Sequence, residues 1–138
     1  MKLKSIFSVV STILLSVLLI SCAQTVSNLN DQPIPADFTQ EQVKSAIIDG
    51  GKNRGWIIIQ SDKPNQLIGR LLYKGKYSVT VDIPYSEKGY SIEYADSVGL
   101  DYDKVENKID RHYNNWVILL NQDIQRKLLI EEAKVKNS

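Results

Sequence analysis

The chain of 138 residues contains one cysteine and one histidine. A single cysteine forms no disulfide within its own chain, so the fold has to rest on an apolar core. Zinc sites use three or four ligands, mostly Cys and His, so this composition argues against one. The balance of 17 basic and 16 acidic residues offers no positive excess for nucleic acid. We therefore expect one small domain with no cofactor, no metal and no nucleic-acid partner.

Motifs for phosphate binding, for zinc proteases and for nucleophilic serines are absent from the sequence. His112 is either a general base or a helix residue hydrogen-bonded at a sheet edge. The second interpretation is favoured, because no nucleophile has a recognisable setting. Asp101, Asp103, Glu106 and Asp110 lack the spacing of a calcium loop and suit a helix N-terminus instead. We expect no enzymatic activity.

A long apolar run occurs once, from Ile6 to Ile20, and it contains no charge. Its length of about 15 residues falls short of the roughly 20 that a membrane-spanning helix needs. Lys2 and Lys4 precede it, as in the positively charged start of a secretory signal. Residues 1–21 are therefore predicted to be a signal peptide.

The run ends in Leu19-Ile20-Ser21-Cys22, which resembles the lipobox of bacterial lipoproteins. The resemblance implies cleavage between Ser21 and Cys22, and acylation of Cys22 with a diacylglyceryl group. Two or more acyl chains hold a protein stably on a membrane. Ala23 follows, where an Asp would resemble the inner-membrane signal, so the pattern implies an outer-membrane lipoprotein that faces the periplasm.

The mature chain is expected to have two parts. Residues 22–37 are polar, contain Pro33 and Pro35 and lack hydrophobic periodicity, so we expect the lipid anchor and a flexible tether. Residues 38–138 are expected to form a single domain. In it, Thr39 and Gln42 have capping-box spacing ahead of a helix over residues 40–52.

Four strands are expected next, joined by short turns. They cover residues 56–60, 67–73, 77–85 and 90–95. Short turns favour antiparallel neighbours, so we expect a four-stranded meander. A stripe from Val105 to Leu128, with capping-box spacing at Asp103 and Glu106, predicts a helix of about 30 residues that ends near Lys134. The predicted fold is α+β, with both helices packed on one face of the sheet.

Two groups of side chains are candidate binding surfaces. Tyr77, Tyr85, Tyr90 and Tyr94 share one face of two neighbouring strands, where they form either an aromatic platform for a small ligand or glycan, or part of the core.

The first hairpin is apolar on both faces, unlike the strands that follow it. The residues in question are Ile57, Ile59, Ile68 and Leu72. Either the tether or the overhanging helix covers them, or they form a contact surface for an envelope protein or a second copy of the chain.

Three groups of residues resemble a group of small, uncharacterised bacterial lipoproteins over roughly residues 38–125. They are Gly55-Trp56, the tyrosine-rich run from Tyr90 to Tyr102, and Tyr113-Asn114-x-Trp116-Val117-x-x-Leu120. The resemblance implies no particular activity. We expect a membrane-anchored periplasmic lipoprotein with a non-enzymatic binding or structural role. The alternative is a small-ligand or glycan-binding domain that uses the tyrosines.

Overall fold

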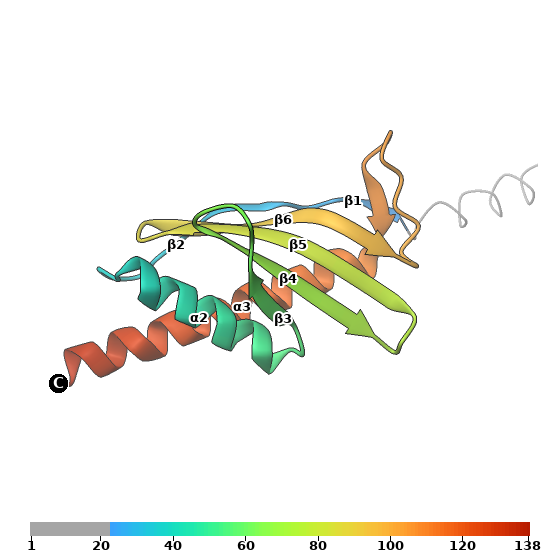
Figure 1. The fold of residues 1–138 in the computed structure, drawn as a ribbon. Coiled ribbons are helices and arrows are strands. Elements are labelled where there is room, and N and C mark those ends of the chain that lie inside the picture. The colour runs from blue at the N-terminus through green and yellow to red at the C-terminus, as the bar shows by residue number, and fades with distance from the viewer. Residues whose placement is uncertain (1–22) are drawn as a thin grey trace, which may run out of the picture.

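The computed structural model describes residues 23–138, so the predicted signal peptide of residues 1–21 and the predicted lipidation site Cys22 lie outside the described residues. The fold is α+β, as predicted: two helices lie under an antiparallel sheet (Figure 1). The five-stranded sheet has the order β2-β6-β5-β4-β3, and β1 and β7 form a separate two-stranded sheet. The elements are β1 (Ala23–Thr25), β2 (Leu29–Pro33), α2 (Gln40–Asn53), β3 (Ile57–Gln60), β4 (Gln66–Tyr73), β5 (Tyr77–Ser86), β6 (Gly89–Val98), β7 (Lys108–Asp110) and α3 (Arg111–Lys136).

The predicted four-stranded meander is confirmed as β3-β4-β5-β6. Residues 74–76 form the tight β4–β5 turn, in which Lys74 and Gly75 have φ of 53° and 63°. The amide of Lys76 donates to the carbonyl of Tyr73 at 3.2 Å. A turn with two successive residues of positive φ has a backbone twist that matches the right-handed twist of the flanking strands.

Helix α2 begins where its capping box predicts. The Thr39 hydroxyl accepts from the Gln42 amide at 3.2 Å, and the Gln42 side chain accepts from the Thr39 amide at 2.8 Å. The face with Val43 and Ile47 is buried against the sheet and α3. Gly50 touches the neighbouring helix so closely that a Cβ there would lie 2.8 Å from the backbone of Ile124. The two helices therefore pack on each other as well as on the sheet.

The start of the last helix differs from the prediction. Helix α3 begins at Arg111 and is capped by Asp110 rather than by Asp103. The Asp103 carboxylate instead accepts from the amides of Val105 and Glu106 within a turn. Asn107 has a φ of 53°, which an α-helix does not tolerate. Val105, which the apolar stripe placed on the buried side, is consequently 95% exposed.

The expected tether is not a free linker in the structure. Its first part forms β1 and β2, which pair with β7 and β6 respectively. Val26 and Phe38 are buried in the common core. Polar side chains of α3 hold the segment in place. Asn114 accepts from the Ser27 amide at 3.0 Å and donates to the Thr25 carbonyl at 3.0 Å.

Two further amide side chains of α3 also bind the N-terminal segment. Asn121 donates to the Gln32 side chain at 2.9 Å, and Gln125 donates to the Pro33 carbonyl at 2.9 Å. The partners of residues 23–37 lie on β6, β7 and α3, far away in the sequence. Such contacts need no hydrophobic periodicity within the segment itself, so the sequence shows none. In the structure, residues of the expected tether therefore pack on the domain that was predicted for residues 38–138.

Candidate functional site

The outer patch consists of Ile57, Ile59, Ile68 and Leu72, the four residues singled out in the first hairpin. They lie on the sheet face that is turned away from the helices, because their strand neighbours Ile58, Leu67 and Leu71 face the core. Ile57 and Leu72 are 66% and 68% exposed, Ile59 is exposed and Ile68 is partly buried. Neither the N-terminal segment nor α3 covers them, so within the described residues the outer patch is open.

Pairing in the sheet places the outer patch at a corner of the molecule. Ile59 lies opposite Ile68, and Ile57 lies opposite Arg70. On the next strand the corresponding positions are polar, with Asp82 opposite Ile68 and Ser78 opposite Leu72. Strand β3 is at the end of the five-stranded sheet, so its other edge has no strand partner among residues 23–138. An apolar corner beside an unpaired edge is suited to binding another polypeptide chain.

The four tyrosines do not form a free aromatic platform. Tyr85 and Tyr90 are buried, and Tyr77 and Tyr94 are half-buried against the helices. The Tyr90 hydroxyl donates to Asn121 at 2.6 Å and accepts from Gln125 at 2.9 Å. Burial raises the pKa of Tyr90 well above its usual range, although the bond from Gln125 opposes the shift.

The two remaining tyrosines, Tyr77 and Tyr94, also contact side chains of the domain. The Tyr94 hydroxyl is hydrogen-bonded to Ser97 at 2.8 Å, and its ring centroid lies 4.3 Å from that of Tyr102. Tyr77 lies 6.5 Å from Trp116, centroid to centroid. Burial is the main cause that raises the pKa of Tyr94. The tyrosines thus serve the core face and its rim, which was the other interpretation of their pattern.

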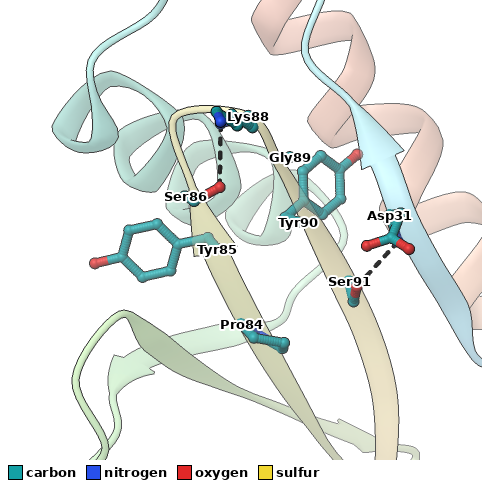
Figure 2. Close-up of a pocket in the computed structure, with 8 residues that line it drawn as sticks. All are labelled: Asp31, Pro84, Tyr85, Ser86, Lys88, Gly89, Tyr90 and Ser91. Carbon is teal, nitrogen blue, oxygen red and sulfur yellow. Dashed lines mark hydrogen bonds between the residues drawn. The ribbon is translucent and has the colours of Figure 1, made fainter.

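A hollow of about 380 Å³ lies at the β5–β6 turn. Its lining contains Tyr85 and Tyr90, whose phenol ends point apart (Figure 2). The rest of the lining combines Pro84 and Gly89 with polar residues. Two of the polar groups already have partners: the Ser91 hydroxyl accepts from the Asp31 amide and the Ser86 hydroxyl from the Lys88 amide. The hollow is therefore open and of mixed character rather than an enclosed aromatic pocket.

His112 has a carboxylate partner at the start of α3. Its Nδ1 lies 2.6 Å from Asp110, whose carboxylate also accepts from the His112 amide at 2.9 Å. This backbone hydrogen bond is the main cause that lowers the pKa of Asp110. The imidazole is more than half exposed, and its ring centroid lies 5.8 Å from that of Trp116. Asp110 caps the helix, and a paired histidine and carboxylate supply only two members of a catalytic triad, which also needs a nucleophile.

The carboxylates that surround the start of α3 are dispersed over a turn, β7 and the helix cap. Within residues 23–138, no group of three or more Asp, Glu, His and Cys side chains has the arrangement of a metal site. Among the same residues, no helix is both long and apolar enough to cross a bilayer.

Sequence reasoning missed the row of amides on α3. Asn114, Asn121 and Gln125 lie seven and four residues apart, which places them on one side of the helix. Polar side chains at helical spacing beside an apolar stripe are the signal that could have indicated a bound extended segment.

The chain was compared with protein-family models, curated proteins and solved structures, and no match was found in any of the three.

Proposed function

We propose that this protein is a lipid-anchored domain of the bacterial cell envelope with a non-enzymatic binding role, exercised through the outer patch. The observation that carries the binding role is the open apolar corner made by Ile57, Ile59, Ile68 and Leu72 next to the unpaired edge of β3. The anchor is inferred from the lipobox Leu19-Ile20-Ser21-Cys22. The resemblance to small bacterial lipoproteins supports the anchor, and Ala23 after the cysteine favours the outer membrane on its periplasmic side.

The anchor is tested by replacement of the acylated residue. In Cys22→Ala, we expect the chain to leave the membrane fraction or to keep its signal peptide, because the acceptor thiol is lost. Fractionation and intact mass of the purified protein measure the two outcomes. Normal processing and normal membrane recovery of Cys22→Ala would contradict the anchor.

The binding role is tested by photo-crosslinking in cells. A crosslinking amino acid at Ile59 lies in the outer patch, and one at Ser45 lies on the exposed side of α2. We expect a discrete adduct from Ile59 and none from Ser45. The partner is either another envelope protein or a second copy of this chain, and the mass of the adduct distinguishes them. Equal capture from both positions would refute a specific surface.

A second candidate is a small-ligand or glycan site at the hollow beside the β5–β6 turn. The observation in its favour is the combination of hydroxyl groups from Ser86 and Ser91 with the cation of Lys88 around one open volume. Titration with soluble envelope glycans, followed by backbone chemical shifts, tests it. Shifts confined to residues 84–91 would support this site, and shifts in β3 and β4 would favour the outer patch.

A further inference from the structure

One end of the molecule brings together four segments that are distant in the sequence: the start of β1, the β4–β5 turn, the end of β6 and the start of α3 (Figure 1). Backbone pairing and ring contacts connect them. Ala23 is paired with Asp110, immediately before α3. The ring of Trp116 on α3 lies 5.2 Å from that of Tyr73 at the β4–β5 turn, centroid to centroid. We call this the anchor end, because Ala23 directly follows Cys22 in the sequence.

The β4–β5 hairpin at the anchor end has an uneven charge. From Gln66 to Val81 the chain has three basic residues and no acidic one. Two of the three, Lys74 and Lys76, are exposed at the turn itself. Their ammonium groups lie 5.2 Å from the ring centroids of Tyr73 and Tyr77 respectively. A positive turn of this kind attracts a negatively charged surface.

The same turn also exposes apolar and aromatic side chains. Leu72 is largely exposed and Tyr73 is 40% exposed. Tyrosine and lysine side chains are typical of the water–bilayer interface, where the ring lies at headgroup level and the ammonium group reaches the phosphates. Leu72 adds a side chain that can enter the acyl region.

The turn is held in a fixed position by the body of the domain. Tyr73 and Tyr77 lie across the ladder from each other, with ring centroids 6.4 Å apart, and both contact Trp116. Gly99, at the end of β6, packs on Tyr77. The domain therefore presents these side chains without any change of fold.

We propose that residues 72–77 of the β4–β5 hairpin seat on the surface of a bilayer that contains anionic lipid. The inference rests on the proposed anchor at Cys22. Because Ala23 is already paired with β7, one peptide unit of less than about 4 Å separates the paired strand from the acylated residue. A domain held so closely has to touch the bilayer with its anchor end.

Charge decides which side of the anchor end faces the lipid. The segment before β7 contains Asp101, Asp103 and Glu106 against one lysine, Lys104, so it is net acidic. It stands on the other side of the anchor end from the hairpin (Figure 1). Anionic headgroups repel that segment and attract Lys74 and Lys76. The domain is expected to tilt towards its hairpin.

The test uses the full chain, acylated in cells and reconstituted into vesicles of phosphatidylcholine and phosphatidylglycerol. An acylated Cys22 has no free thiol, so a second cysteine takes a fluorescent label at one place. Ser78→Cys places the label next to the hairpin, and Glu87→Cys places it at the opposite end of β5. Nitroxide-labelled headgroups quench fluorophores that are near the bilayer surface.

We expect at least several-fold stronger quenching at position 78 than at position 87. Lys74→Gln with Lys76→Gln is expected to reduce the difference at least two-fold. The matched control, Lys63→Gln with Lys134→Gln, removes two exposed lysines that lie away from the hairpin and should leave the difference unchanged. Thermal melting verifies that all variants are folded.

Equal quenching at both positions would overturn the proposal, as would a preference that the hairpin lysines do not affect. Intact mass separates this failure from that of the anchor. An acylated protein with equal quenching refutes the seated hairpin alone, whereas a protein without acyl groups refutes the anchor and the seated hairpin together.

Discussion

Two buried tyrosines, Tyr90 and Tyr113, differ in whether their hydroxyl groups have hydrogen-bond partners. Tyr90 has two hydrogen-bond partners on α3. Tyr113 is completely buried, and its hydroxyl has no partner among the described residues. Burial raises the pKa of both phenols beyond their usual range, so both stay neutral. The two residues therefore differ in hydrogen bonding rather than in charge.

Replacement of Tyr113 by Phe is expected to leave the protein as stable or to stabilise it by about 1 kcal/mol, because it removes an unsatisfied buried group. Tyr90→Phe is the matched control, and it should cost about 1–2 kcal/mol, since the Asn121 side-chain oxygen loses its donor and the Gln125 amide loses one of its two acceptors. Urea denaturation measures both free energies of unfolding. A loss of stability in Tyr113→Phe equal to that in Tyr90→Phe would show that Tyr113 has a partner after all.

The cap of α3 predicts a dependence of stability on pH. The folded-state pKa of Asp110 is lowered from its ordinary value of 3.8, chiefly by the hydrogen bond from the His112 amide. The ionised carboxylate therefore stabilises the fold above about pH 4, and this contribution is lost as the pH falls through the lowered pKa. Asp110→Asn keeps a capping side chain but does not titrate. Its stability curve should be flatter than that of the parent below about pH 4, by less than about 1 kcal/mol at this exposed site. Parallel curves would exclude Asp110 as the source.

At the scale of elements, a helix or strand could be predicted from the sequence only where its own residues contain a hydrophobic or capping pattern. Strands β5 and β6 alternate in hydrophobicity, β4 is a short apolar run bounded by turn residues, and α2 has its own capping box, so these elements were predictable. Strand β2 has the sequence Leu-Asn-Asp-Gln-Pro and no alternation. Its position depends on β6 and on amides of α3 that are about 90 residues away. No local pattern encodes such a pairing.

The N-terminal segment is expected to come loose when its principal contact on α3 is removed. Asn114→Ala deletes the acceptor for the Ser27 amide and the donor to the Thr25 carbonyl, at a cost of about 1–3 kcal/mol. Hydrogen exchange at Ser27 and Val26 should become faster, while exchange in β4 and β5 stays slow. Asn115→Ala, one position along and exposed, is the control. Unchanged protection at Ser27 in Asn114→Ala would contradict the role of this side chain.

At the scale of the whole molecule, the outer patch allows the proposed binding role to be tested without a change in stability, because most of its side chains are exposed. The patch could be predicted because both faces of β3 and β4 are apolar, whereas its openness could not, since that depends on where the N-terminal segment and α3 pack. Its relation to the anchor end was equally hidden, because the sequence places Cys22 and Lys74 about 50 residues apart.

Ile57→Ser is expected to change the free energy of unfolding by no more than about 0.5 kcal/mol, because the side chain is 66% exposed. The variant should nevertheless lose the adduct formed by the crosslinker at Ile59, or disperse an oligomer seen by sedimentation. Leu67→Ser, completely buried on the opposite face of the hairpin, should instead unfold the domain. A large loss of stability in Ile57→Ser would show that the patch belongs to the core.

Helix α3 begins beside Ala23 and continues for 26 residues, a length of about 39 Å at 1.5 Å per residue. Its last turn, with Lys134 and Lys136, therefore lies far from the first strand. If the first strand is held at a membrane, as proposed, the length of α3 sets an upper limit on the distance between the bilayer and Lys136. Shortening α3 by whole turns would lower that limit in steps of about 5.4 Å.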